Sequence, residues 1–273
     1  MYPSPRILVA LILIALTSQV RGELRFQSTM QQVALIELFT SEGCSSCPPA
    51  ENWLGELTHE KGLWTSFVPV AFHVDYWDQL GWRDSFATRQ ATQRQYDYAK
   101  HWVNGSVYTP CFVRNGDEWR RNKTKLGEPS HIASGVLTVT LNSDREAIVN
   151  FAPANRLEDG LELTVALLGN GIVSSVRSGE NAGRELRHDF SVLWFNKVAM
   201  QEKSKSGFNA QVVLPKMSDV YTGHQAIAVW VSRRGSAAPI QATGGWVNFG
   251  ESTASQRNLS LGANADLSAT GFR

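Results

Sequence analysis

A cysteine pair set between an apolar run and a double proline is the feature that most constrains the fold of this chain. The run from Val33 to Phe39 is almost continuously apolar, as expected of a strand buried on both faces of a sheet. Cys44 and Cys47 follow with two serines between them, and Pro48 and Pro49 come next. Proline is tolerated in the first turn of a helix. The order predicts a strand, a short loop and a helix, with both thiols at the N-terminus of the helix.

Thiols in that position favour thiol–disulfide exchange. The helix dipole and the free N–H groups of the first turn stabilise a thiolate. We therefore expect Cys44 to be the exposed, more reactive thiol that attacks a disulfide, and Cys47 to resolve the mixed disulfide. The same spacing also fits a permanent structural disulfide or half of a metal site.

A second element further along the chain favours thiol–disulfide exchange over a structural disulfide or half of a metal site. Thr109-Pro110 precedes an expected strand from Cys111 to Arg114, and the turn Asn115-Gly116 is the strongest short signal for a type I′ hairpin. In this order the chain resembles the thioredoxin superfamily, in which a cis Thr-Pro or Val-Pro step faces the Cys-x-x-Cys pair. The resemblance implies that Pro110 is cis and that a substrate backbone docks beside Thr109. An ordinary trans proline at a strand start is the alternative.

Three longer stretches give a narrower resemblance. They run from Glu37 to Pro49, from Phe72 to Asp78 and from Leu80 to Asp84. They are similar to a secreted thioredoxin-like family known as domain of unknown function 1223. The resemblance implies a fold and a redox-type site, but it identifies no substrate.

Glu37 is the one charged residue of the first buried strand. In thioredoxins a buried carboxylate lies in the same strand at almost this offset and exchanges protons with the resolving cysteine. The resemblance therefore implies that Glu37 takes the proton of Cys47, since burial disfavours the charged carboxylate. The alternative is that Glu37 points to a solvated edge or pairs with an arginine.

Three other side chains are candidates for the same site. Cys111 directly follows the Thr-Pro step, so it could join Cys44 and Cys47 around a soft ion such as Cu(I), with His73 as a further ligand. Side chains alternate across a strand, however, and we favour Cys111 as a small core residue. A packed, hydrogen-bonded imidazole is likewise the simpler interpretation of His73. Trp77 could form the wall of a substrate groove, although such aromatic residues are usually core.

Residues 1–22 are expected to be a signal peptide. Arg6 supplies a basic start, and the apolar stretch from Ile7 to Leu16 is too short to span a bilayer. Cleavage after Gly22 would leave 24 basic residues against 25 acidic ones, a net charge of −1. A chain this close to neutral has no electrostatic reason to bind nucleic acid, or a membrane once the signal is removed.

The rest of the chain predicts two domains. Residues 23–130 alternate strand and helix signals, including a helix from Phe86 to about Trp102. Residues 131–250 contain short β-rich runs without helical periods, which favours a sandwich. Residues 251–273 have the composition of a flexible tail. The predicted fold is an α/β thioredoxin-like N-terminal domain followed by an all-β sandwich-like C-terminal domain.

We therefore expect a secreted or periplasmic thiol–disulfide oxidoreductase. It would need no cofactor beyond the redox-active Cys44–Cys47 disulfide, and its partners would be protein thiols or disulfides; no oligomeric state follows from the residues. Two alternatives stay open. One is a copper- or zinc-binding or delivery protein that uses Cys44, Cys47 and either Cys111 or His73. The other is a non-catalytic binding module with a structural disulfide.

Overall fold

The computed structural model describes residues 23–102, 105–120, 126, 130–157, 160–204, 207–216 and 224–248. The predicted signal peptide and the predicted tail lie outside these residues. The strands are β1 Leu24–Gln27, β2 Ala34–Thr40, β3 Phe67–His73, β4 Cys111–Arg114, β5 Asp117–Glu118, β6 Gly135–Leu141, β7 Glu146–Pro153, β8 Leu161–Asn170, β9 Ile172–Ser175, β10 Glu185–His188, β11 Ser191–Ala199, β12 Gln201–Ser204, β13 Gly207–Val213, β14 His224–Arg233 and β15 Pro239–Val247. The helices are α1 Pro48–Glu56 and α2 Arg89–Ala99, with 3-10 turns η1 Leu57–His59 and η2 Asp75–Leu80.

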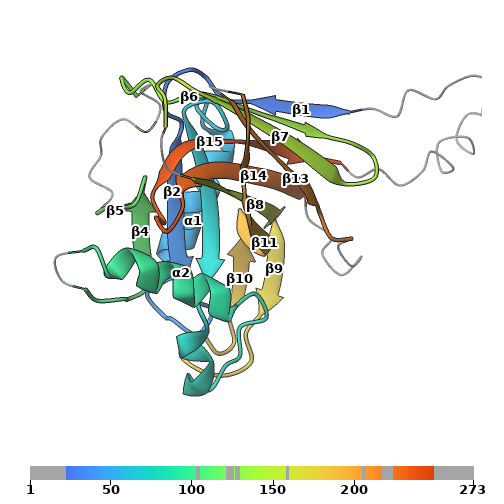
Figure 1. The fold of residues 1–273 in the computed structure, drawn as a ribbon. Helices are drawn as coiled ribbons and strands as arrows, with labels where there is room; N and C mark the ends of the chain where they lie inside the picture. Colours follow the sequence, from blue (N-terminus) through green and yellow to red (C-terminus); the bar gives the residue numbers. More distant parts are fainter. Residues whose placement is uncertain are drawn as a thin grey trace, which may run out of the picture.

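One eight-stranded mixed sheet draws on both halves of the chain (Figure 1). Its order is β15-β14-β8-β11-β3-β2-β4-β5. Strands β2 and β3 are parallel, and β4 pairs antiparallel with β2. The two halves meet where β11 pairs with β3 through Ser191 and Ala71. The antiparallel strands β8, β14 and β15 continue the sheet beyond that point.

The fold prediction is wrong, because the first half of the chain does not form an α/β thioredoxin-like domain that stands apart from a β domain. Strands account for 48% of the structure and helices for only 14%. The physical reason is the pairing of β11 with β3, which makes the parallel strands part of a larger, mostly antiparallel sheet. The boundary expected near residue 130 stays a prediction.

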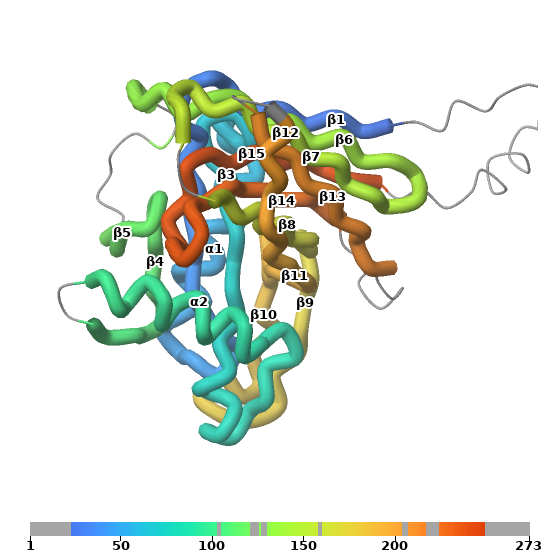
Figure 2. The backbone as a smooth tube through the Cα atoms, viewed as in Figure 1, coloured from blue at the N-terminus to red at the C-terminus, as the bar shows by residue number. Residues whose placement is uncertain are grey.

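A five-stranded antiparallel sheet, in the order β1-β6-β7-β13-β12, covers one face of the large sheet. Figure 2 shows β1, at the start of the described chain, beside the later strands β6 and β7. Strand β8 has a two-residue period with both faces buried. Leu163 and Val165 pack toward the five-stranded sheet, whereas Ala166 and Leu168 join the core around β2 and β3. The large sheet therefore lies between two hydrophobic cores.

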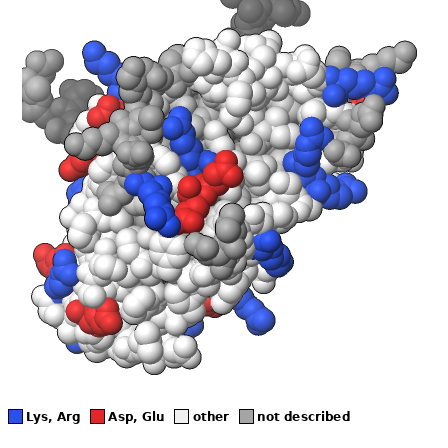
Figure 3. Space-filling model, turned by 90° about the vertical axis from the view of Figure 1, so that its left-hand side faces the viewer, with Lys and Arg blue, Asp and Glu red and all other residues white. Residues whose placement is uncertain are grey.

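The two α-helices lie near the ends of β2 and β3, where the candidate site is built. Helix α1 contacts β2 and β10, and α2 contacts β3 and η2. Helix α2 begins later than predicted, with Thr88 as its N-cap, and the Thr88 hydroxyl accepts a hydrogen bond from the Ala91 N–H. Among the described residues, no helix is long and apolar enough to cross a membrane. On the face drawn in Figure 3, Lys and Arg side chains lie next to Asp and Glu side chains near the centre.

Candidate functional site

Cys44 and Cys47 form a disulfide at the start of α1. Their sulfur atoms are 2.26 Å apart and their Cα atoms 5.4 Å apart. Cys47 is the N-cap of the helix. Neither residue has any exposed surface, so the expectation of an exposed Cys44 is wrong. Any thiol–disulfide exchange at this disulfide therefore requires the residues that bury it to move.

The first turn of α1 offers fewer N–H donors than expected. Pro48 and Pro49 have no N–H group, and the N–H groups of Ala50 and Glu51 donate to the Cys47 carbonyl at 2.8 and 3.1 Å. Stabilisation of a Cys44 thiolate therefore depends on the helix dipole and on side chains.

One such side chain is adjacent. The Ser46 hydroxyl lies 3.4 Å from the Cys44 sulfur. A hydroxyl at this distance is able to donate a hydrogen bond to a thiolate, which favours the charged form.

The cover over the disulfide is the connection between β9 and β10, residues 176–184, which we call the hairpin loop. The Asn181 side-chain amide donates to the carbonyl oxygens of Glu42 and Cys44, at 2.8 and 3.0 Å. The Glu180 carboxylate accepts from the Ser45 N–H at 3.0 Å. Hydrogen bonding with the Ser45 side chain, and then with its backbone, lowers the pKa of Glu180. Asn181 is completely buried. The hairpin loop therefore binds directly to the backbone of the cysteine motif.

Trp77 links the cysteine motif to the Thr-Pro step. The Thr109–Pro110 peptide bond is cis, which confirms that expectation. The Trp77 indole N–H donates to the Thr109 hydroxyl at 2.8 Å. A Cβ at Gly43 would come within 3.1 Å of the Trp77 Cβ, so glycine allows the tryptophan to lie against the loop before Cys44. Substrate docking at Trp77, Thr109 and Pro110 stays a prediction.

Glu37 is fully buried and paired with an arginine, which is the alternative that the sequence left open. Arg94 Nε lies 2.5 Å from one carboxylate oxygen, and the Tyr98 hydroxyl donates to the other. Burial opposes the charged guanidinium, but the Glu37 charge outweighs it and raises the pKa of Arg94. A role for Glu37 in taking the Cys47 proton stays a prediction.

Cys111 packs in the hydrophobic core on β4, opposite Phe39 of β2. Burial raises the pKa of its thiol to about 11. Among the described residues, the groups whose donor atoms converge closely enough to hold a metal do not include Cys44, Cys47 or Cys111. No observation therefore favours the soft-metal alternative built on these cysteines.

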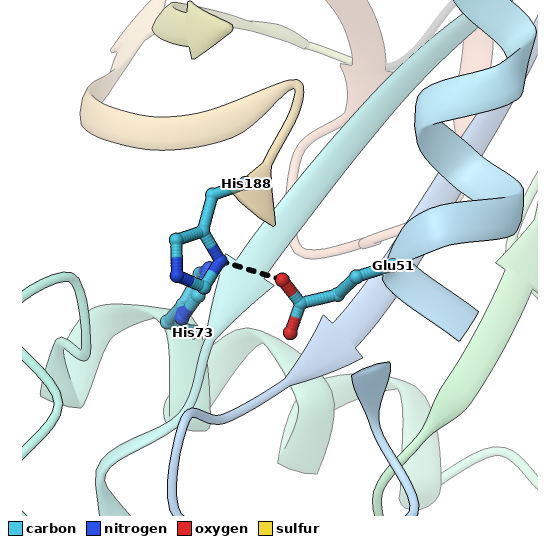
Figure 4. Close-up of side chains that lie close together, drawn as sticks. All are labelled: Glu51, His73 and His188. Atoms are coloured by element: carbon cyan, nitrogen blue, oxygen red, sulfur yellow. Dashed lines mark hydrogen bonds and ion pairs between the residues drawn. The ribbon is translucent and has the colours of Figure 1, made fainter. Parts of the chain in front are cut away.

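His73 instead converges with Glu51 and His188 (Figure 4). His73 ends β3, Glu51 projects from the first turn of α1, and His188 ends β10. His188 Nδ1 lies 2.6 Å from Glu51 Oε2, and the two imidazole centroids are 5.2 Å apart. All three side chains are buried.

Further buried carboxylates hold the two histidines. Asp84 Oδ2 lies 2.7 Å from His73 Nδ1, and Glu42 Oε1 lies 3.1 Å from His188 Nε2. Ser174 Oγ is 2.9 Å from the same His188 nitrogen. The five titratable residues, which we call the histidine–carboxylate cluster, are Glu42, Glu51, His73, Asp84 and His188.

Electrostatics in the cluster favour ion pairs. Burial opposes a charged His188, but hydrogen bonds to Glu42 and Glu51 raise its pKa to about 10. Burial also opposes a charged His73, but the Asp84 charge raises its pKa. Despite burial, the pKa of Glu42 is lowered by its His188 hydrogen bond, and that of Asp84 by the His73 charge.

Sequence reasoning found His73 but missed the rest of the cluster. Its members come from one helix, two strands and two loops, and no local spacing connects them. The sequence offered one partial signal, an acidic residue in the helical turn directly after the cysteines, which is Glu51.

Comparisons with known proteins give a family and a fold. The family model described as "Protein of unknown function (DUF1223)" matches residues 35–232. No curated protein matches the chain. Among solved structures, protein AGR_C_4864 from Agrobacterium tumefaciens is 24% identical, with a TM-score of 0.56 over 82% of this chain and 98% of that chain. HBP35 of Porphyromonas gingivalis is 15% identical, with a TM-score of 0.55 over 89% of this chain and 81% of that chain. At these identities the likeness concerns the fold alone.

Proposed function

Since the chain belongs to the DUF1223 family, whose function is unknown, we propose its activity from the site alone: it is an exported thiol–disulfide oxidoreductase that uses Cys44 and Cys47 as its redox pair. The observation that carries the proposal is the bond between these two sulfurs at the start of a helix. A disulfide that spans three residues closes a very short loop, so it constrains the unfolded chain less than a long-range disulfide would. This favours a reactive role over a purely stabilising one.

Each reaction cycle moves two electrons. A thiolate on a reduced substrate attacks Cys44 Sγ, which forms a mixed disulfide and releases Cys47 as a thiolate. A second substrate thiolate then attacks the substrate sulfur of the mixed disulfide and releases Cys44. The substrate leaves oxidised and the protein is left as a dithiol; the reverse sequence oxidises the protein and reduces the substrate.

Access to Cys44 requires displacement of the hairpin loop. Asn181 and Glu180 bind the backbone of the motif from outside, so their release exposes the first cysteine. Trp77 and Thr109 would then lie at the edge of the exposed disulfide. Trp77 packs against Gly43, in the loop before Cys44, and its indole N–H donates to the Thr109 hydroxyl. We assign substrate backbone docking to Thr109 and Pro110.

The partners we propose are protein thiols or disulfides outside the cytoplasm, reached after removal of residues 1–22. No cofactor is required, because the disulfide itself carries the electrons. The mature chain has almost no net charge, so shape and backbone pairing would select its partners, with little electrostatic steering.

Complete burial of both cysteines favours the rival function, a non-catalytic module with a permanent disulfide. Equilibration of the mature chain, residues 23–273, in glutathione and dithiol buffers separates the two. We expect reversible reduction of Cys44–Cys47 in the folded protein and catalysis of insulin disulfide reduction. We also expect Cys47→Ser, but not Cys44→Ser, to accumulate mixed disulfides. Reduction that occurs only when the protein unfolds would establish the structural role instead.

A further inference from the structure

We propose that Glu51, His73 and His188 form a binding site for one divalent transition-metal ion. The inference does not rest on the redox function, because no ligand is a cysteine. It concerns side chains that no step of the proposed exchange reaction uses.

The donor set suits such an ion. One donor atom from each residue lies within 4.8 Å of the others, and all three side chains are buried. Two imidazole nitrogens and one carboxylate oxygen match the ligands of catalytic zinc sites and of non-haem iron sites. The ligands come from α1, β3 and β10, so the folded protein fixes them from three directions (Figure 4).

Each ligand also has a partner that orients it. Histidines that bind metals usually donate their second ring nitrogen to a carboxylate or another oxygen. Asp84 holds His73 through Nδ1, which leaves His73 Nε2 only a weak contact of 3.4 Å with Ser191. Glu42 holds His188 through Nε2, which directs Nδ1 toward Glu51.

Glu51 is oriented in the same way. The Thr40 hydroxyl donates to Oε1 at 2.6 Å, which turns Oε2 toward His188. A bound ion would take the place of the hydrogen bond between His188 Nδ1 and Glu51 Oε2. His73 Nε2 would supply the third protein ligand.

The charge balance of the cluster is compatible with a bound ion. Glu42, Glu51 and Asp84 are three buried carboxylates in contact with only two histidines. Buried carboxylates need nearby positive charge. A divalent cation bound to the neutral imidazoles would supply the two positive charges that the two imidazolium groups otherwise carry, so binding releases two protons and leaves the net charge of the cluster unchanged.

A cavity borders the cluster at His73. It has a volume of about 380 Å³, and His73, Phe86, Thr88, Val192 and Phe195 line it. The Phe86 ring lies 5.1 Å from each of the two imidazole centroids. Of the three proposed ligands, His73 is the one that lines this cavity.

Zinc titration of the oxidised mature chain tests the proposal, because the intact disulfide keeps Cys44 and Cys47 from binding the metal. After dialysis against a chelator, we expect calorimetry to give one equivalent of bound Zn²⁺. Substitutions His73→Ala and His188→Ala should each weaken binding at least 100-fold, and Asp84→Asn by 10- to 100-fold. His101→Ala is the matched control, because His101 is exposed and lies outside the cluster.

Two further measurements keep the test decisive if an alanine variant fails to fold. Glu51→Gln preserves the side-chain shape and should abolish the rise in melting temperature that Zn²⁺ gives the wild type. Co²⁺ should give visible bands of a nitrogen–oxygen site without a thiolate charge-transfer band. No binding by the wild type, or equal binding by the wild type, Glu51→Gln and His188→Ala, would overturn the proposal.

Discussion

At the scale of single residues, Glu37 occupies the middle of a strand in which all seven residues are buried. Arg94 reaches it from α2, and the guanidinium lies 5.0 Å from the centre of the Trp230 ring. Glu37 has no exposed surface, and the Arg94 side chain is only 6% exposed. Each therefore depends on the other, and the pair connects α2 to the centre of the large sheet.

Glu37→Gln should destabilise the protein by roughly 3 to 5 kcal/mol, because Arg94 would keep its charge in a buried site without a counter-ion. Urea unfolding followed by circular dichroism measures the change. Asp97→Asn is the control: its pair with Lys100 is exposed, so the cost should stay below about 1 kcal/mol. An unchanged or higher unfolding free energy for Glu37→Gln would show that Arg94 has another source of compensation.

Cys111 should resist alkylation in the native, reduced protein. Only the thiolate reacts, and a pKa of about 11 keeps this thiol protonated at pH 8. Iodoacetamide followed by mass spectrometry should locate the label on Cys44 and Cys47 first, with Cys111 labelled after denaturation. Cys111→Ala should cost on the order of 1 kcal/mol from a small cavity and leave the redox equilibrium unchanged. Native labelling of Cys111 at a rate equal to Cys44 would contradict this assignment.

At the scale of elements, the loop of the hairpin formed by β9 and β10 binds the backbone beside the disulfide through Asn181 and Glu180. Residues 172–175 pair with residues 185–188 in a two-stranded sheet of their own. Among the described residues, the hairpin has no ladder hydrogen bonds to either large sheet. It is held by the loop contacts at Glu42, Cys44 and Ser45 and by the contacts that Ser174 and His188 make with Glu42 and Glu51.

Asn181→Ala should speed reduction of the disulfide by dithiothreitol roughly tenfold. The variant loses two hydrogen bonds of the closed hairpin, and about 1.4 kcal/mol is a conservative value for their sum. The rate of reduction is measured by quenching samples at successive times and labelling their free thiols. Asn150→Ala is the control, since Asn150 is exposed on β7. Identical rates for the two variants would mean that reduction does not require the hairpin to open.

The sequence predicted individual elements better than their assembly. The apolar run before the cysteines is β2, the double proline begins α1, and Asn115-Gly116 has the positive φ values of the expected turn. The β-rich stretch from Leu186 to Phe195 forms two strands, β10 and β11, and Phe190 between them has a φ of 56°. Alternation of apolar residues defines a strand but not its neighbour. The pairing of β3 with β11 therefore could not be predicted.

The same distinction applies to the candidate site. Cys44 and Cys47 are recognisable because their chemistry depends on local spacing. Glu42, Glu51 and His188 become a cluster only when α1, β3 and β10 pack together. That packing leaves no pattern in a single sequence. His188 lies in a strand whose residues alternate between exposed and buried, and no residue near it in the sequence marks it as part of a site.

At the scale of the whole molecule, the continuous eight-stranded sheet contains strands from both halves of the chain. Both hydrophobic cores include residues of β8 and β14, so each core shares its strands with the other. If one core unfolded, β8 and β14 would no longer be packed on that face, and the other core would be destabilised. The first half of the chain would also lose the neighbour of β3.

We therefore expect the mature chain to unfold in one thermal transition, with a calorimetric enthalpy equal to the van't Hoff enthalpy. The fragment 23–130 should not fold alone, because β3 would expose the edge that β11 covers. Differential scanning calorimetry of the full chain and circular dichroism of the fragment measure these outcomes. Two separate transitions, or a folded fragment, would instead support the boundary predicted near residue 130.

The contact between Ser45 and Glu180 joins positions 135 residues apart. Synthesis proceeds from the N-terminus, so the cysteine motif exists for a long interval before its cover has been made. During that interval the two thiols are available to any oxidant that the emerging chain meets. We therefore expect the disulfide to form most readily during synthesis, before residues 176–184 have been added and have folded against the motif.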